Sequence, residues 1–479
     1  MMNRNHKQRT TWTVWGVSTI LTALFLLASC ASQDLELLLT NTPQEFVRDA
    51  NAQISPTPIG QNEIKQETEP IKPQPSEETP SRDAPSYGYT YQRADGNRLL
   101  TGWGSFPDVD VVDVPLEGMP IWLAAAPGIN TSIWVAILED GRAQAFSISG
   151  QAITPVSISP DSLPTGSPPL LEVNSSGAYL VVAPSEEASH LTSPAILDGE
   201  RGQLAYIESN GDLVIWEQGV RTRLPVNALL DGRLLVDERQ RLLLLSDPTE
   251  RYDHGVLGDE QEAASITLVE TTPTPRIVME IKIDPPGVIE GIAPIWADLT
   301  GDGQREIIVT RSDAEIGAQI LVYDERGNLI AKGSEIGRGY RWRNQLSVAP
   351  FSPSGELELT DVLTPHIGGL VEFYRFVGDR LEIIAQVGGY TSHVIGTRNL
   401  DMALSGDFNG DSKIEVVLPS QDLTKLKALQ RIDESAAEIW SLEVGGNVST
   451  NLSAVLQPGG GLALGVGRHD GTLRVWISK

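Results

Sequence analysis

Two short acidic segments with nearly the same pattern constrain the fold of this chain more than any other feature. Residues 298–309 have the sequence DLTGDGQREIIV, and residues 407–418 have the sequence DFNGDSKIEVVL. Each begins with alternating oxygen-bearing side chains and continues directly into a β-branched strand. Two such copies indicate a repeated structural unit, and the length of the repeat limits the architectures that the chain can adopt.

A third copy lies midway between these two segments. Residues 350–359, PFSPSGELEL, align so that Phe351 falls on Phe408 and Glu358 on Glu415. The three copies start at residues 298, 350 and 407, which are 52 and 57 residues apart. A repeat of this length is about the size of one four-stranded blade of a β-propeller.

Hairpin patterns recur at the same scale between residues 142 and 444. Six segments form complete hairpins, several with Asn-Gly, Gly-Asp or Gly-Asn between the strands, which is typical turn chemistry. A seventh segment, residues 462–478, lacks one strand, and residues 108–116, DVDVVDVPL, can supply it. The sequence therefore predicts an all-β fold: a single β-propeller of seven four-stranded blades whose last blade is completed by an N-terminal strand.

The number of blades depends on a region with a weaker pattern. The spacing of the units is uneven between residues 126 and 298, so six or eight blades are left open. A pair of β-sandwiches is the alternative architecture for a chain of many short strands.

The first thirty residues differ from the rest of the chain. Residues 1–10 carry basic side chains and no acids, and an apolar run follows that ends in Leu-Ala-Ser-Cys30, the only cysteine. This ending resembles the lipobox of bacterial lipoproteins, which implies removal of residues 1–29 as a signal peptide and lipidation of Cys30. A plain secretory signal is the alternative. The resemblance further implies an exported, membrane-anchored protein, and Ala31 after the cysteine favours the outer membrane or outer surface, facing the periplasm or exterior.

Residues 30–87 are predicted to be a lipidated N-terminus followed by a disordered tether. Residues 53–84 are rich in Pro, Glu, Gln, Ser and Thr and contain no aromatic residue. Such a segment cannot bury enough apolar surface to offset the entropy lost on ordering. The propeller domain is accordingly predicted to cover residues 88–479.

The charge of the chain is strongly negative. It has 36 Lys and Arg against 63 Asp and Glu, and without the three basic residues of the signal peptide the formal charge is −30. This argues against binding of nucleic acid, or of an anionic membrane through a basic patch. It suits cationic partners, including divalent metal ions.

The two acidic loops place possible metal ligands at alternate positions. Positions 1, 3, 5 and 9 offer side-chain oxygens and position 7 offers a backbone carbonyl, a pattern that lets a tight loop surround one hard cation. The ligands predicted in this way are Asp298, Thr300, Asp302, Gln304 and Glu306 in one loop, and Asp407, Asn409, Asp411, Lys413 and Glu415 in the other. Neither loop is an EF-hand, because position 12 is apolar and a strand follows.

Both loops resemble the calcium loops of FG-GAP/VCBS repeats, which occur in integrin-α-type propellers and many bacterial surface proteins. The resemblance implies one or two Ca²⁺ ions with a structural role. Thr300 and Ser412 depart from the usual Asn and Gly, and Thr is a poorer ligand, so the first site is expected to be the weaker one. An acidic turn without an ion is the alternative. The midway loop, with Pro350, Ser352 and Ser354, has lost its carboxylates and is expected to hold its shape without metal.

Enzymatic activity is left open by the sequence. The six histidines form no metal-catalytic motif, and no nucleophile or nucleotide motif occurs. The segments around His366 and around Tyr390 and His393 are the polar-aromatic loops that could serve a catalytic site.

Residues 338–343 form a basic-aromatic loop in an acidic chain, and Tyr340, Arg341, Trp342 and Arg343 are predicted as ligand-binding residues. The function predicted from all these features is a lipid-anchored, calcium-stabilised propeller. It would act as a binding module for an unknown protein or glycan at the bacterial cell envelope. An extracytoplasmic enzyme acting on glycans and an envelope-assembly scaffold are the alternatives.

Overall fold

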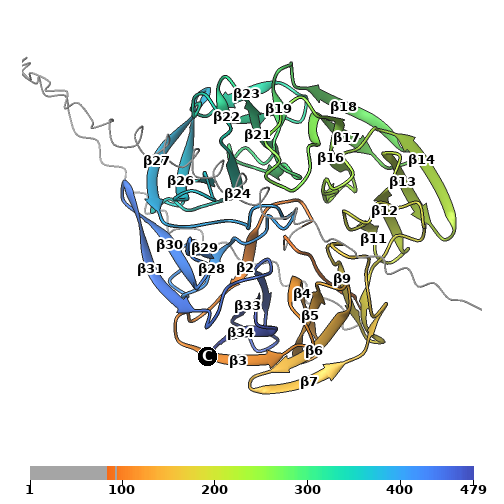
Figure 1. Cartoon of the computed structure of the whole chain (residues 1–479), viewed down its shortest axis with the longest axis vertical. Coiled ribbons are helices and arrows are strands. Elements are labelled where there is room, and N and C mark those ends of the chain that lie inside the picture. Colours follow the sequence, from red (N-terminus) through yellow and green to blue (C-terminus); the bar gives the residue numbers. More distant parts are fainter. Residues whose placement is uncertain (1–83, 92–93) are drawn as a thin grey trace, which may run out of the picture. The chain divides into compact units, whose positions relative to one another are not determined.

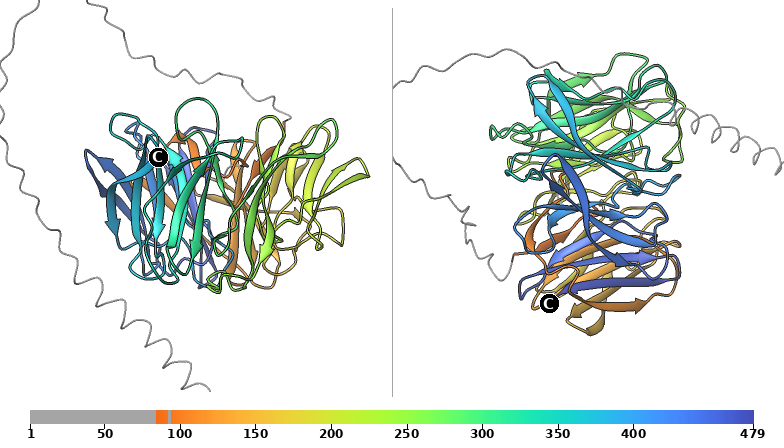
Figure 2. Two further views of the ribbon diagram at one scale, coloured as in Figure 1. Left: turned by 90° about the horizontal axis from the view of Figure 1, so that it is seen from above. Right: turned by 90° about the vertical axis from the view of Figure 1, so that its left-hand side faces the viewer.

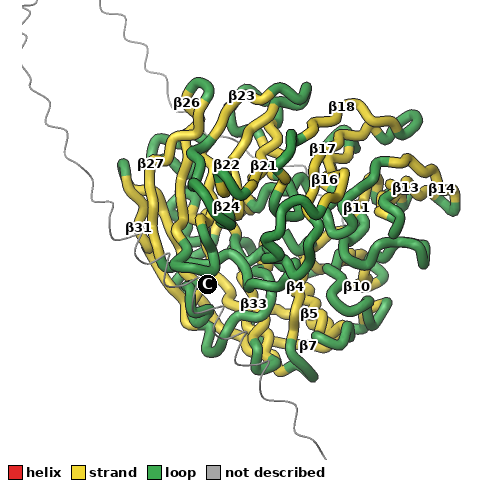
Figure 3. Tube along the Cα trace, turned by 45° about the horizontal axis from the view of Figure 1, so that its top comes forward, coloured by secondary structure: helices red, strands yellow, loops and turns green. Residues whose placement is uncertain are grey.

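The computed structural model describes residues 84–91 and 94–479, and these residues form strands and loops without a helix (Figure 3). The described residues belong to one compact unit. The predicted signal peptide, Cys30 and the tether up to residue 83 lie outside the described residues. Within the part described, no segment forms a helix that could span a bilayer.

The strands pair into arrays of four, numbered here along the chain. The first four are array 1, with β4 (Pro120–Gly128), β5 (Thr131–Leu138), β6 (Ala143–Ser149) and β7 (Ala152–Val156); array 2, with β1 (Ser86–Gly88), β9 (Leu171–Asn174), β10 (Gly177–Leu180) and β8 (Ile158–Ser159); array 3, with β11 (Ala195–Asp198), β12 (Gln203–Ile207), β13 (Asp212–Glu217) and β14 (Val220–Pro225); and array 4, with β15 (Leu235–Val236), β16 (Leu242–Thr249), β17 (Glu262–Glu270) and β18 (Arg276–Lys282).

The remaining strands follow the same plan. They form array 5, with β20 (Ile295–Ala297), β21 (Glu306–Asp313), β22 (Gly317–Tyr323) and β23 (Leu329–Lys332); array 6, with β24 (Arg343–Ala349), β25 (Glu358–Leu363), β26 (Leu370–Val377) and β27 (Arg380–Gly388); array 7, with β28 (Leu404–Asp407), β29 (Glu415–Pro419), β30 (Lys425–Ile432) and β31 (Ser435–Glu443); and array 8, with β32 (Ser453–Leu456), β33 (Leu462–Arg468), β34 (Thr472–Ser478) and β3 (Val109–Pro115). β2 (Leu99–Trp103) adds to the inner edge of array 7, and β19 (Val288–Ile289) links arrays 4 and 5.

The arrays follow one another in chain order around a common centre (Figure 1). Seen from the side, their strands stand beside one another and their loops lie at the two ends (Figure 2). The described residues give eight arrays, whereas the sequence predicts seven units. The difference is array 2, whose hairpin strands β9 and β10 have only four residues each and whose other strands come from β1 and the two-residue β8.

The N-terminal strand predicted for the last unit is confirmed. β3 pairs antiparallel with β34 from Val109 opposite Ser478 to Pro115 opposite Thr472. Val112 and Val114 of β3 are buried and pack with residues of arrays 1 and 8. A strand from the N-terminal part of the described chain and the last strand therefore lie in one sheet.

Apolar side chains from neighbouring arrays meet in shared clusters. Alternation along each strand turns successive side chains toward opposite neighbours, so one array contributes to two clusters. In the described residues these clusters join arrays 8 and 1, 1 and 2, 3 and 4, 4 and 5, 5 and 6, 6 and 7, and 7 and 8. Trp134, Trp296 and Trp476 are the largest fully buried side chains, and each lies in one of these clusters.

The segment before β3 fills the space between the first strands of arrays 6 and 7. The Asn97 side chain donates to the Val348 carbonyl of β24 at 3.0 Å, and Arg98 donates to the Leu346 carbonyl at 2.9 Å. Arg98 also forms a buried ion pair with Asp401 at 2.6 Å. The chain's own residues thus occupy the inner edges of these arrays.

Candidate functional site

The two acidic loops occupy equivalent positions in arrays 5 and 7. Asp298 directly follows β20 and Glu306 begins β21, and Asp407 ends β28 and Glu415 begins β29. Each loop therefore connects the first and second strands of its array. This equivalence explains why the two segments share one sequence pattern.

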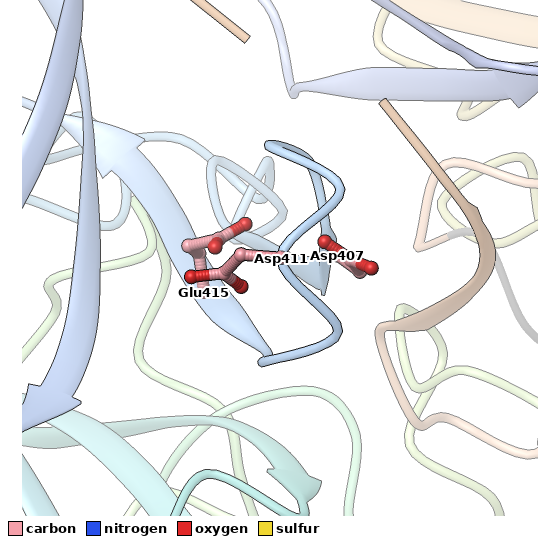
Figure 4. Close-up of side chains that lie close together, drawn as sticks. All are labelled: Asp407, Asp411 and Glu415. Atoms are coloured by element: carbon pink, nitrogen blue, oxygen red, sulfur yellow. The ribbon is translucent and has the colours of Figure 1, made fainter. Parts of the chain in front are cut away.

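The loop of array 7 gathers three carboxylates. One oxygen from each of Asp407, Asp411 and Glu415 lies within 4.8 Å of the other two (Figure 4). Backbone amides fix the first of them, because Gly410 N donates to Asp407 Oδ1 at 2.7 Å and Ser412 N donates to Oδ2 at 3.1 Å. The turn chemistry of the loop thus aims its acidic side chains at a common point.

The buried end of this cluster is electrostatically unfavourable without a cation. Glu415 is fully buried, and burial together with the neighbouring carboxylates Asp411 and Asp407 raises its pKa to about 8. Burial also raises the pKa of Asp407. The partners that hold Glu415 are the Phe408 amide, at 2.7 Å, and the Gln430 side chain, at 3.2 Å, and both are neutral donors.

The donor set of this loop fits a hard divalent cation. Carboxylate and carbonyl oxygens are the ligands that Ca²⁺ takes, and three carboxylates supply the negative charge that such a site needs. The Asn409 side chain accepts from the Asp411 amide at 2.9 Å, and the Lys413 amide donates to Asp411 at 2.9 Å. These contacts keep the two residues within the loop that holds the acids.

The loop of array 5 has the same backbone hydrogen bonds as the array 7 loop, but its acids do not form a close group. Asp298 accepts from the amides of Gly301 and Gly303 at 2.7 and 2.9 Å, and the Gln304 amide donates to Asp302 at 2.8 Å. Among the described residues, a close group of three metal-ligating acidic or histidine side chains occurs in the array 7 loop and not in this one.

Glu306, the last acid of the array 5 loop, is satisfied by the backbone. It is buried and accepts from the amides of Leu299 and Thr300, at 2.7 and 3.1 Å, and from the Thr300 hydroxyl at 3.3 Å. Burial raises its pKa. The Thr300 hydroxyl, which the sequence predicts as a metal ligand, therefore donates to Glu306 within the loop.

The midway loop of array 6 keeps the turn without the acids. Ser352 and Ser354 contact each other at 2.8 Å, and both hydroxyls donate to Glu356 at 3.2 Å. Glu358, which corresponds to Glu415, accepts instead from Arg375 and Arg431. Positive charge in this loop is supplied by arginine side chains.

The structure separates the residues of the predicted basic-aromatic surface. Trp342 and Arg343 are 2% and 4% exposed, because they lead into β24, the buried first strand of array 6. Arg343 pairs with the buried carboxylates of Asp361 and Glu372. Arg341 is half-buried, and only Tyr340 has an exposed side chain. A ligand on the surface would contact Tyr340 and would not reach the Trp342 indole or the Arg343 guanidinium.

A histidine–carboxylate pair was missed in the sequence. His254 Nδ1 lies 2.5 Å from Glu290 Oε1, and the Ser312 hydroxyl donates to the other oxygen of this fully buried carboxylate. Burial raises the pKa of Glu290. His254 stacks beside Tyr340, with ring centroids 5.5 Å apart. The two residues of the pair are 36 positions apart and match no motif, so only the fold brings them together.

The polar-aromatic loops singled out in the sequence also meet. The rings of His366 and His393 are 4.3 Å apart, and Trp342 packs on His393 at 4.6 Å. Burial lowers the pKa of His366 to about 4 and lowers that of His393 as well. Tyr390 is buried elsewhere, in the cluster between arrays 6 and 7. Both histidines are therefore neutral at pH 7.

Comparison with known proteins assigns no family to this chain. No protein family model matches the chain, and no curated protein matches it. A chain of the crystal structure of the mitotic checkpoint complex aligns with 76% of this chain and 93% of its own length, at 12% identity and a TM-score of 0.39. The crystal structure of Chaetomium thermophilum Raptor aligns with 81% of this chain at 11% identity and a TM-score of 0.40, and this chain spans 29% of it. The description of the fold as all-β and propeller-like rests on the arrangement of the chain's own strands.

Proposed function

We propose that this protein is a calcium-stabilised β-propeller of eight blades, held at the bacterial cell envelope by a lipid anchor, where it acts as a binding module. Each array corresponds to one blade in this proposal. The pairing of β3 with β34 and the cluster between arrays 8 and 1 support a closed ring, because together they join the last array to the first. Radial repetition of blades leaves only short, protected sheet edges.

The grouping of Asp407, Asp411 and Glu415 carries the calcium proposal. A buried carboxylate beside two others is costly unless a cation or a proton compensates it. A Ca²⁺ ion bound here would take one oxygen from each acid and would fix the hairpin between β28 and β29. Its role would be structural, because the loop joins two strands of one array. The array 5 loop, whose acids do not form such a close group, would bind an ion more weakly.

The anchoring part of the proposal rests on the sequence. Cys30 stands at the end of the apolar signal-like run, and it is the only cysteine. The acidic composition argues for a protein or glycan partner and against nucleic acid. A binding role is supported by the segment that fills the inner edges of arrays 6 and 7, since this segment takes up space where a channel site would otherwise lie.

Isothermal titration of the purified full chain with CaCl₂ tests the metal site. We expect one ion to bind with measurable heat, and Glu415→Gln to abolish the binding while Asp302→Asn in the other loop leaves it in place. Saturable binding that persists in the Glu415→Gln variant would place the ion elsewhere. No binding at millimolar calcium would remove the metal from the proposal.

The pair of His254 and Glu290 favours a second candidate function, that of an extracytoplasmic enzyme acting on glycans. A carboxylate that holds one ring nitrogen of a histidine fixes its tautomer and leaves the other nitrogen for acid–base chemistry. The test is hydrolysis of a glycan panel by the wild type and by His254→Ala. Activity that depends on His254 would establish an enzyme, and a complete lack of hydrolysis would exclude this candidate.

A further inference from the structure

One pair of neighbouring arrays differs from the others in how it packs. Among the described residues, seven of the pairs share a buried apolar cluster, and arrays 2 and 3 share none. A pocket of about 460 Å³ lies beside them instead. This volume is within the range of ligand-binding pockets, and protein interiors seldom leave such a space between packed elements.

Strand alternation explains the missing cluster. In array 2, Leu171 and Val173 of β9 pack against array 1, and Glu172 lies between them in sequence and so turns to the other side. In array 3, Ala205 and Ile207 of β12 belong to the cluster shared with array 4, whereas Tyr206 between them turns toward array 2. The two facing surfaces are thus more polar than those of the packed pairs.

The pocket contains two buried hydroxyl groups without a partner. Tyr206 is 2% exposed and Thr192 is 6% exposed, and both line the pocket. Neither Tyr206 Oη nor Thr192 Oγ1 has a hydrogen-bond partner in the protein. Leaving a buried hydroxyl unpaired is unfavourable, so each group gains from a ligand that supplies an acceptor.

The rest of the lining defines the chemistry of that ligand. Its walls combine apolar side chains with hydroxyl side chains, of which those of Ser167 and Ser189 already donate to backbone carbonyls. The apolar lining residues include Pro164, Pro168, Val181 and Pro194. The lining side chains that can carry a charge near neutral pH are Glu186 and His190, and both are exposed at the rim. The buried part of the pocket therefore suits an uncharged ligand with hydrogen-bond acceptors.

This chemistry distinguishes between the two partner classes of the proposed function. A sugar presents many hydroxyl groups that both donate and accept, and the proline and valine side chains of the lining would leave those that face them unpaired. The backbone of a peptide presents carbonyl acceptors at regular intervals, separated by side chains that can contact proline and valine. We propose that the pocket between arrays 2 and 3 binds an uncharged, extended peptide segment of a partner protein. This inference rests on the proposed role of the chain as a binding module.

In the bound state, the hydroxyls of Tyr206 and Thr192 donate to carbonyl oxygens of the peptide. Small apolar side chains of the peptide contact the prolines and valines of the walls. Peptides with Asp or Lys at the centre bind less well, because the walls offer no partner for the desolvated charge.

The test uses the full chain in detergent and N-acetylated, C-amidated tetrapeptides made of Ala, Val, Pro and Ser. We expect saturation-transfer NMR and calorimetry to detect binding of these neutral peptides, with at least tenfold weaker binding of matched peptides that carry a central Asp or Lys. Tyr206→Phe keeps the shape of the side chain and removes the donor, so we expect affinity to fall about tenfold while the melting temperature stays the same or rises.

Two further variants keep the result interpretable. Ala183→Trp fills the pocket from a half-buried loop position and is expected to abolish binding. Tyr179→Phe on β10 lies outside the lining and is expected to leave affinity unchanged.

Several outcomes would overturn the inference. These are no binding of any neutral peptide, equal binding of charged peptides, binding unaffected by both Tyr206→Phe and Ala183→Trp, or competition by oligosaccharides. Peptide binding that is unchanged in the pocket variants would show that the peptide binds elsewhere. It would leave the proposed role as a binding module intact. A glycan array run on the same chain separates failure of the pocket from failure of the binding module as a whole.

Discussion

Arg431 Nε donates a hydrogen bond to Glu358 Oε2 at 2.9 Å, and both side chains are fully buried. Arg375 donates to the other oxygen of Glu358, also at 2.9 Å. Glu358 begins β25, as Glu415 begins β29, so the two glutamates hold equivalent positions. The array 6 loop, which lacks the aspartates, receives positive charge from arginine. The array 7 loop keeps its aspartates and has neutral donors, which is the difference expected if a cation belongs there.

Replacing Arg431 with methionine should destabilise the protein strongly. The substitution leaves Glu358 as a buried carboxylate that has lost one of its two cationic partners, and removal of one partner of a buried pair costs about 3–5 kcal/mol. Urea unfolding measures this loss. Arg375→Met is the matched control, because its side chain is 30% exposed and water can replace it, so a smaller loss is expected. Equal effects of the two variants would contradict the special role of Arg431.

Closure of the sheet by β3 predicts a sharp difference between two adjacent valines. Val112 is 2% exposed and packs in the cluster of arrays 8 and 1, whereas Val111 is 45% exposed. Val112→Asp buries an unpaired charge and should lower the free energy of unfolding by about 3 kcal/mol or more. Val111→Asp should change it by less than about 0.5 kcal/mol. Similar melting temperatures for the two variants would argue that β3 does not hold the ends of the unit together.

The buried histidines predict a loss of stability in acid. Burial lowers the pKa of His366 from 6.5 to about 4, so below pH 6.5 the unfolded chain binds a proton that the folded chain cannot. The contribution of His366 therefore destabilises the fold progressively as the pH falls from about 6.5 to about 4. His366→Asn should make the fall in melting temperature over this range shallower. The matched control is His469→Asn, at an exposed position, whose profile should follow that of the wild type.

The proposed lipidation of Cys30 predicts that its sulfur atom controls membrane association. A Cys30→Ser variant produced in a bacterium should move from the detergent phase to the aqueous phase in a phase-separation experiment, because the serine hydroxyl does not accept the lipid. Ser29→Ala, at the neighbouring position, keeps the cysteine and should remain in the detergent phase. Detergent partitioning of the Cys30→Ser variant would point to anchoring by another segment.

The parts of the fold that were predictable depend on local patterns. The two acidic loops correctly predicted that β21 and β29 hold equivalent positions. This was possible because a turn and the β-branched strand after it are recognisable from a few adjacent residues. The N-terminal strand was predicted because the last unit lacks one strand and residues 108–116 have the pattern of a strand. Array 2 was not counted because β9 and β10 are too short to produce a long hairpin pattern, and because β1 comes from a distant part of the chain.

The parts of the site that were not predictable depend on long-range contacts. Trp342 and Arg343 have the composition of a binding loop, but they begin a first strand that is buried on both faces, and a sequence does not mark which strand lies innermost. The contact between His254 and Glu290 joins different segments of the chain. The contact between Arg431 and Glu358 does the same. Contacts of this kind follow from the register of the arrays, which no single segment specifies.

Thermal melting of the full chain with calcium and then with chelator directly tests whether a calcium ion stabilises the fold. An ion that binds only the folded state stabilises it by about 2.7 kcal/mol at a hundredfold excess over its Kd, so calcium should raise the melting temperature and chelator should reverse the rise. Glu415→Gln keeps the shape of the side chain and an acceptor for the Phe408 amide and removes the unfavourable charge, so we expect its melting temperature without calcium to equal or exceed that of the wild type, with no rise when calcium is added. An unchanged melting temperature of the wild type on adding calcium would contradict a stabilising calcium ion. An equal rise in the Glu415→Gln variant would contradict its binding at the array 7 loop.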